Sequence, residues 1–314
     1  MKRVMITGST GFIGMWLVKE LLKNGVEVIA LVRNAATSQF QGSLEDPLLK
    51  VVQYYTKEYD ALLDDEGEID VFYHLAWGGV SAELKNDSAL QMDNMRFSME
   101  MLEFAHRLKA GRFIATGTVA EYAFSENIMD VNGKQTPNDM YGAAKTATHY
   151  MLETRARLLG IPFNWAVLPS TFGEGRRNDN IITYTIITLL KGERPRYGSL
   201  EQMWDFLYAG EVARALRYIG EKGKGEKTYA IGSGVFKPLK DYIIQIRDII
   251  NPDLELGIGE IPSYSDKAFS SCVSIYDLTK DTGFVPEIDF REGLNKTIPY
   301  YVNRAFDVER QGCG

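Results

Sequence analysis

Short apolar runs alternate with longer segments of helical periodicity along the first 170 residues of the chain. The runs that predict strands cover residues 3–7, 27–32, 49–54, 71–75, 112–116 and 164–168. The segments that predict helices cover residues 12–24, 87–110 and 140–159. Strands that alternate with helices are typical of parallel pairing through right-handed crossovers. Because the strands show little in–out alternation, we expect a doubly wound α/β sheet that is covered on both faces.

The pattern is less regular after residue 170. A polar loop at 173–180 precedes predicted helices at 181–191, 209–219 and 240–250, a strand at 227–231, and short helices within 277–306. We expect residues 1–170 to form the sheet domain and residues 203–232 to return to it. Residues 171–202 and 233–306 are expected to form a smaller, mixed α/β part that binds the substrate.

Composition narrows the functional classes. The 314 residues carry a formal net charge of −7 and no basic stripe, which argues against a nucleic-acid partner. The two cysteines, Cys272 and Cys313, form no metal-type cluster and fit a reducing, cytoplasmic compartment. The three histidines lack zinc-ligand spacing, so no metal is expected. No apolar run is long enough to predict a membrane helix, so no membrane partner is expected.

A glycine motif follows the first predicted strand and opens the first predicted helix. Gly8, Gly11 and Gly14 have the spacing G-x-x-G-x-x-G. In such a motif one glycine permits a tight turn, one lets the backbone approach a pyrophosphate, and one lets the helix pack on the strand. The helix N-terminus then favours the anion. The motif predicts a dinucleotide site, with its remaining contacts at Thr10, Phe12 and Ile13.

The end of the second predicted strand bears on the choice of cofactor. Sites that prefer NAD usually place an acidic residue here, whereas this chain has Arg33. A guanidinium suits a 2′-phosphate, so NADP(H) is favoured and NAD(H) remains open. The alternative is that Arg33 is an ordinary solvated loop residue. Leu75 and Ala76, at the end of the fourth strand, are expected to pass beside the cofactor.

Tyr141 and Lys145 lie four residues apart in a predicted helix and therefore share one face of it. A free phenol has a pKa of about 10, and a neighbouring ammonium favours the phenolate. We therefore expect Lys145 to lower the pKa of Tyr141 and to make it a proton donor and acceptor for an alcohol or carbonyl. Taken alone, this spacing is also common on solvated helix faces.

Several motifs in the same order resemble those of the extended short-chain dehydrogenases, the NAD-dependent epimerase/dehydratase family of nucleotide sugars. They are the glycine motif, the segments 74–76 and 113–122 with Thr118, the residues Asn94, Tyr141 and Lys145, and the segments 205–208, 211–213, 277–280, 283–286 and 293–294. The resemblance covers nearly the whole chain. It implies a Rossmann-type sheet and a homodimer formed through residues 87–110 and 140–159. The Met and Leu content of these two segments is equally compatible with packing inside one chain.

The resemblance also implies roles for individual residues. Tyr141 would exchange a proton with the substrate oxygen, Lys145 would hold the nicotinamide ribose, and Thr118 would orient the same oxygen. The further cofactor contacts that it implies are Asn94, Thr116 and Pro169. The further substrate contacts are Trp77, Arg176, Asn180 and Trp204.

Three departures from the family pattern matter. Dehydratases carry an Asp-Glu pair directly after the catalytic Thr, but this chain has Val119 and Ala120, which cannot transfer protons. The family usually has Arg at the position of Trp204, and it commonly has another Arg near residues 168–169. Four arginines are candidates for the missing positive charge, although each also fits an ordinary surface position: Arg176, Arg177, Arg194 and Arg196.

Together, these features predict an oxidoreductase or epimerase acting at C4 of a nucleotide-linked sugar. Arg33 favours a 4-ketoreductase over a 4-epimerase, because NADPH supports net reduction. Two alternatives stay open: an NADPH-dependent reductase of a non-nucleotide carbonyl compound, and a non-catalytic NADP-binding sensor. The sequence names neither the sugar nor the base.

Overall fold

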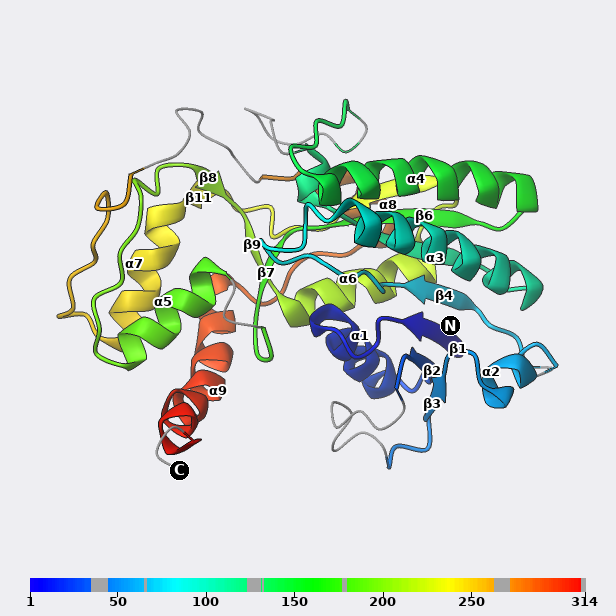
Figure 1. Ribbon diagram of the computed structural model, residues 1–314, viewed down its shortest axis with the longest axis horizontal. Coiled ribbons are helices and arrows are strands. Elements are labelled where there is room, and N and C mark those ends of the chain that lie inside the picture. Colours follow the sequence, from blue (N-terminus) through cyan, green and yellow to red (C-terminus); the bar gives the residue numbers. More distant parts are fainter. Residues whose placement is uncertain are drawn as a thin grey trace.

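The computed structural model describes residues 1–34, 45–64, 67–122, 131, 133–176, 180–262 and 272–311 (Figure 1). Its centre is a seven-stranded parallel sheet in the order β10-β6-β5-β4-β1-β2-β3. The strands are β1 (Arg3–Thr7), β2 (Glu27–Val32), β3 (Leu49–Gln53), β4 (Val71–His74), β5 (Phe113–Thr118), β6 (Phe163–Leu168) and β10 (Lys227–Ala230). The expected doubly wound α/β fold is confirmed.

Helices cover both faces of this sheet (Figure 1). Helices α1 (Phe12–Lys23) and α6 (Ala209–Lys222) pack on one face, and α3 (Ser88–Arg107) and α4 (Met140–Leu159) pack on the other. Side chains of β1 alternate between the two faces. Val4 and Ile6 pack in the apolar core under α1 and α6, and Met5 packs in the core under α3 and α4. Burial on both faces explains why these strands are apolar at nearly every position.

A second group of helices lies beyond the carboxyl end of the sheet (Figure 1). It consists of α5 (Ile181–Leu190), α7 (Leu239–Ile250) and α9 (Phe290–Gln311), which share a separate apolar core. Two small sheets accompany it, formed by β7 (Ser170–Phe172) with β9 (Phe206–Tyr208) and by β8 (Met203–Trp204) with β11 (Lys237–Pro238). The division into domains by residue ranges stays a prediction.

Some elements differ from those expected. The short helices expected within 277–306 are instead α8 (Tyr276–Thr282) and the long helix α9, which continues through Pro299. Strand β5 runs on to Thr118, because its pairing with β6 extends through Thr118↔Leu168. A short helix, α2 (Lys57–Ala61), was not expected from the sequence. Among the described residues no helix is long and apolar enough to cross a membrane.

Candidate active site

The carboxyl ends of the parallel strands define where a ligand is expected. Strands β1, β2 and β3 follow one another towards one edge of the sheet, whereas β4, β5 and β6 proceed from β1 towards the other. The order therefore reverses between β1 and β4. Ligands of doubly wound sheets bind in the crevice at such a reversal, outside the carboxyl ends of the strands.

The glycine motif forms the turn between β1 and α1, and its geometry fits a dinucleotide. A Cβ at Gly8, which has φ +69°, would lie 2.6 Å from the backbone nitrogen of Ala76, so this turn packs directly on the end of β4. A Cβ at Gly14 would lie 2.1 Å from the Gly8 carbonyl oxygen. Gly11 is exposed, and its missing side chain leaves the outer surface of the turn open to a phosphate.

The N-terminus of α1 also fits an anion. Gly11 is its N-cap, and no side chain accepts a hydrogen bond from its first turn. By contrast, the side chains of Asp87, Asp139 and Asn180 accept such bonds at the N-termini of α3, α4 and α5. The free N–H groups of α1 and its dipole would favour a pyrophosphate. Gly8, Thr10, Gly11, Phe12, Ile13 and Gly14, all predicted cofactor contacts, lie in or beside this turn.

A buried histidine joins the glycine turn to α3. Ser98 donates to the Asn94 carbonyl oxygen at 2.8 Å, so the Ser98 oxygen accepts from His74 Nε2 at 2.9 Å. His74 Nδ1 then accepts from the Thr7 hydroxyl at 2.8 Å, and Thr7 accepts from the Ala76 N–H at 3.3 Å. This assignment requires a neutral imidazole. Burial, together with a smaller effect of the nearby Lys145 charge, lowers the pKa of His74 to about 3.

The loop after β4 carries Trp77 to the site. The side-chain amide of Asn94 donates to the Gly78 carbonyl oxygen and accepts from the Gly78 N–H, both at 2.9 Å. The indole N–H of Trp77 donates to Gln91 at 2.9 Å, and Gln91 donates to the Gly79 carbonyl oxygen at 3.0 Å. Asn94, predicted as a cofactor contact, thus holds this loop, while Leu75 and Ala76 lie between it and the glycine turn.

Thr118, Tyr141 and Lys145 come together from two elements. Thr118 ends β5, and the other two lie on consecutive turns at the start of α4. The Thr118 hydroxyl hydrogen-bonds the Tyr141 phenol. Lys145 Nζ donates to the Thr116 carbonyl oxygen at 2.6 Å.

Trp77 covers this group. Its ring centroid lies 4.0 Å from Lys145 Nζ and 6.2 Å from the Tyr141 ring, which meets it edge to face. Trp77, Thr118, Tyr141 and Lys145 therefore form one cluster at the end of β5.

The expected lowering of the Tyr141 pKa is wrong for this structure. The pKa of Tyr141 is raised to about 12, mainly by burial and also by the charges of Glu121 and Asp139. The Thr118 hydrogen bond and the charge of Arg176 oppose it. Burial also lowers the pKa of Lys145, because it destabilises the charged ammonium relative to the neutral amine. Tyr141 is therefore a protonated phenol at neutral pH, suited to donating its proton.

Glu121 was missed by reasoning from the sequence. It lies in the 3₁₀ helix η2 (Val119–Tyr122) and is fully buried beside Trp165 of β6. A charged residue between the apolar Ala120 and the aromatic Tyr122 was the available signal. Gln91, which holds Trp77, gave no comparable signal because glutamine is common on helix surfaces.

Two other predicted cofactor residues lie at neighbouring strand ends. Arg33 follows β2 and is exposed, close enough to Tyr54 for its charge to act on that phenol. Pro169 is buried directly after β6, and its carbonyl oxygen accepts from the Thr171 hydroxyl at 3.0 Å. Arg33 is thus available to a phosphate, whereas Pro169 shapes the strand end.

Arg176 is the predicted substrate residue with the clearest position at the site. Its guanidinium lies 5.4 Å from the centre of the Phe12 ring in the first turn of α1, and its charge acts on Tyr141. The Tyr301 hydroxyl of α9 donates to the Arg176 carbonyl oxygen at 2.6 Å. Arg176 therefore lies between the glycine turn and the Tyr141 phenol.

The remaining candidate residues have other surroundings. Asn180 caps α5 by accepting from the Thr183 N–H at 3.1 Å. Trp204 lies in β8 and packs near Phe206, with ring centroids 6.2 Å apart. Arg194 and Arg196 both pair with Glu260, at 2.5 and 3.1 Å. Arg177 lies outside the described residues.

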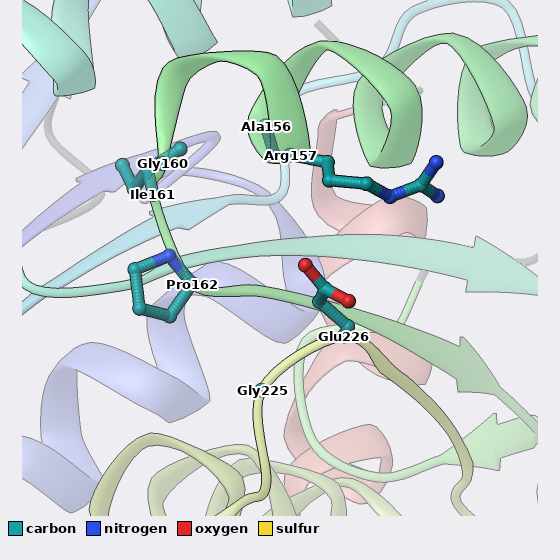
Figure 2. A pocket seen from close by; sticks show the side chains of 7 residues that line it. All are labelled: Ala156, Arg157, Gly160, Ile161, Pro162, Gly225 and Glu226. Carbon is teal, nitrogen blue, oxygen red and sulfur yellow. The ribbon is translucent and has the colours of Figure 1, made fainter.

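A shallow hollow is found away from this cluster (Figure 2). It lies between the end of α4 and the start of β6, with Arg157 and Glu226 on opposite sides. The start of β6 is the edge of the sheet opposite to the carboxyl ends that carry Thr118. The hollow therefore takes no part in the site. No group of three or more His, Cys, Asp or Glu that could hold a metal ion occurs in the described part of the chain.

Comparisons with known proteins agree with this geometry. A model of the NAD dependent epimerase/dehydratase family matches residues 4–232. The dTDP-glucose 4,6-dehydratase of Escherichia coli is 23% identical, covering 99% of this chain and 96% of its own. Protein CapI of Staphylococcus aureus is 22% identical, covering 96% and 98%.

Solved structures share the fold. UDP-glucuronic acid 4-epimerase from Bacillus cereus, in complex with UDP-glucuronic acid and NAD, matches with a TM-score of 0.84 at 20% identity, covering 96% of this chain and 99% of its own. UDP-glucose 4-epimerase from Thermotoga maritima matches with a TM-score of 0.80, also at 20% identity and with the same coverage of both chains. Because the family match spans most of the chain, this protein belongs to the NAD dependent epimerase/dehydratase family, the extended short-chain dehydrogenases that its motifs resemble.

Proposed function

We propose that this protein transfers hydride at C4 of a nucleotide-linked sugar and acts as a 4-ketoreductase. The observation that carries the proposal is the cluster of Thr118, Tyr141 and Lys145 at the carboxyl end of β5, with a protonated phenol at its centre. Relatives with the same fold are named for nucleotide sugars, including UDP-glucuronic acid and dTDP-glucose.

The residues of the cluster have separable tasks. The Tyr141 hydroxyl donates its proton to the substrate carbonyl oxygen as that oxygen gains negative charge. The Thr118 hydroxyl, whose oxygen accepts from the Ala120 N–H at 3.2 Å, donates to the same region and orients the substrate. Lys145 would hold the ribose hydroxyls of the cofactor. The nicotinamide, when bound, supplies the hydride.

The glycine turn and the strand ends around it would hold the cofactor. Gly8, Gly11 and Gly14 let the backbone approach the pyrophosphate, and the uncapped N-terminus of α1 favours its charge. Arg33 supports NADP(H) because an exposed guanidinium after β2 suits a 2′-phosphate. Two relatives of known structure, from Bacillus cereus and Bacillus anthracis, are in complex with NAD, so the proposed preference for NADP(H) depends on Arg33 alone.

Elimination of water is disfavoured. Val119 and Ala120 occupy the two positions after Thr118 at which dehydratases place their acid and base. Glu121 does not replace them, because its carboxylate is buried against Thr118 N–H and the Trp165 indole. Of the two remaining reactions, the high pKa of Tyr141 supports reduction, which begins with a protonated phenol.

Arg176 is the best-supported contact for the substrate phosphates. Its guanidinium lies beside Phe12 and its charge acts on Tyr141. A nucleotide-linked sugar bound between the sheet domain and the α5–α7–α9 group would place its phosphates in this region. Trp204, in place of the usual Arg, keeps a non-nucleotide carbonyl substrate as the second candidate. A thermal-shift screen of nucleotide sugars in the presence of NADP or NAD separates the two substrate classes.

A homodimer formed through α3 and α4 is part of the proposal. The two helices pack side by side (Figure 1). Helix α4 also presents apolar side chains to solvent. Tyr150 is 56% exposed, Met151 46% and Leu158 73%. An exposed apolar strip of this kind is typical of an interface.

The test is turnover of 4-keto nucleotide sugars with NADPH and with NADH, followed by the absorbance of the reduced cofactor. Tyr141→Phe should lower kcat by about 10²-fold or more while changing the cofactor Kd less than about threefold. Tyr150→Phe, on the same helix but exposed, is the matched control and should retain wild-type activity. Retained activity in Tyr141→Phe would refute the mechanism. Tightly held NAD with turnover but no net oxidation of cofactor would refute the reductase and support the epimerase.

A further inference from the structure

Glu121 is a buried carboxylate that the proposed reaction does not use. It is 0% exposed. Its Oε1 accepts from the Thr118 N–H at 2.7 Å, and both of its oxygens lie 3.3 Å from the Trp165 indole nitrogen. The Gln135 amide donates to Oε2 at 3.3 Å. All three donors are neutral, so they orient the carboxylate without cancelling its charge.

The surrounding residues are shaped to admit this carboxylate. A Cβ at Gly117 would lie 2.2 Å from the Trp165 indole nitrogen and 2.5 Å from Glu121 Oε1. Only glycine at position 117 therefore lets the indole and the carboxylate meet beneath the end of β5. On its other face, the Trp165 ring stacks on His149 at 4.7 Å and an interplanar angle of 3°. The carboxylate is thus fixed by contacts from β5, β6 and the segment before α4.

Lys145 is the cation that this charge acts on. It is 4% exposed, and its ammonium lies between the rings of Trp77, at 4.0 Å, and Trp165, at 5.7 Å. Burial alone lowers the pKa of Lys145, and Glu121 raises it. Burial likewise raises the pKa of Glu121, and Lys145 opposes that rise. Each group therefore stabilises the charged form of the other.

Other titratable groups face the pair from the elements around it. Tyr141 and Asp139 lie at the start of α4, and Arg176 acts on Tyr141 from the loop after β7. His74, at the end of β4, feels the charge of Lys145. His149 lies behind Trp165. Among the described residues, the charge that raises the pKa of Lys145 is that of Glu121, which makes Glu121 the group to test.

We propose that Glu121 is a positioning residue whose carboxylate acts on the Lys145 ammonium on the other side of the Trp165 indole and holds the Thr118 backbone in place for the reaction. In this role, its carboxylate supplies the negative charge that the aromatic surroundings of Lys145 lack. Lys145 then presents an ammonium, rather than an amine, to the ribose of the cofactor. The inference rests on the proposed function for its consequence in catalysis, but the charge of Lys145 is measurable without turnover.

The first experiment is an NMR titration of the protein labelled with ¹³C at lysine Cε. The Lys145 signal is identified by its loss in Lys145→Met. In Glu121→Gln, an isosteric neutral change, the titration midpoint of Lys145 should fall by about one pH unit or more. Glu121→Asp keeps the charge and should recover most of that fall. The control is Glu103→Gln, which removes the exposed carboxylate of α3 that pairs with Arg155 of α4.

The second experiment measures the NADPH dissociation constant as a function of pH. At pH values above the wild-type midpoint, Glu121→Gln should bind up to about tenfold more weakly, because a midpoint shift of one unit corresponds to that factor. Lowering the pH well below the variant's midpoint should restore binding. A purely structural role would weaken binding at every pH, without this recovery.

The outcomes separate the two proposals. An unchanged Lys145 midpoint in Glu121→Gln overturns the inference and leaves the proposed hydride transfer untouched. A shifted midpoint in a protein that turns over no nucleotide sugar supports the inference and refutes the proposed function. If Glu121→Gln does not fold, the wild-type protein labelled at glutamate Cδ provides the test. The Glu121 signal must then show an inflection at the Lys145 midpoint, and its absence overturns the inference.

Discussion

Lowering the pH from 7 to 5 should destabilise the folded protein through His74. Its folded-state pKa is about 3, because burial penalises the imidazolium, whereas an unfolded histidine has a pKa of about 6.5. Between these values the unfolded chain binds a proton that the folded chain does not. Stability is therefore fully present above about pH 6.5 and is lost as the pH falls towards 3. Integrated from pH 7 to pH 5, the loss from this one residue is about 2 kcal/mol.

Urea unfolding at pH 7 and pH 5 measures this loss. His74→Gln keeps a donor and an acceptor between Thr7 and Ser98 but does not titrate. The fall in the free energy of unfolding between the two pH values should therefore be smaller in the variant by about 2 kcal/mol. His106→Gln removes the same side chain from an exposed position of α3 and is the matched control. Unchanged m-values would show that the same folded and unfolded states are being compared.

Equal pH dependence in wild type and His74→Gln would contradict this account. So would an NMR titration in which the imidazole of His74 gains its proton near pH 6.5 in the folded protein. Either result would mean that the hydrogen bonds from Thr7 and to Ser98 do not hold a neutral ring. The assignment of the loop after β4 to that network would then fail as well.

Three further predictions test the cofactor site and the assembly. Gly14→Ala places a Cβ 2.1 Å from the Gly8 carbonyl oxygen, a backbone atom that cannot move away without distorting the turn. The variant should lose about 1–3 kcal/mol of stability and bind NADPH more weakly in calorimetry. Gly225→Ala, whose Cβ would contact only Pro162 at 3.8 Å, should change neither property. Arg33→Asp should raise the NADPH dissociation constant by about tenfold or more and leave that of NADH within about threefold, and equal effects on both would refute the assignment of Arg33 to a 2′-phosphate. Leu158→Glu should convert a dimer to a monomer in light scattering after size exclusion. Val285→Glu should not, because Val285 is 56% exposed and its backbone contacts Arg214 of α6, away from α3 and α4. A dimer in both variants would place the interface elsewhere.

Much of the fold was predictable because it depends on local and periodic properties. Strands β1 and β2 have the predicted bounds, since a strand buried on both faces is apolar at nearly every position and polar residues mark its ends. Helix α4 also has its predicted bounds, beginning after the capping Asp139 and ending at Gly160, which has φ +71°. By contrast, β8 and β11 have two residues each, too few for a period of two to be recognised.

The features of the candidate site also fall into those that local sequence spacing decides and those that it does not. The sequence by itself determined the glycine turn and the placement of Tyr141 and Lys145 on one helix face, because spacing along the backbone decides both. Only the tertiary structure decided that Trp77 lies over Lys145 and that Glu121 lies beneath Thr118. It also decided that the Tyr141 pKa rises rather than falls. Ring contacts, buried charges and desolvation depend on residues brought together from distant strands and helices, and no local spacing encodes them.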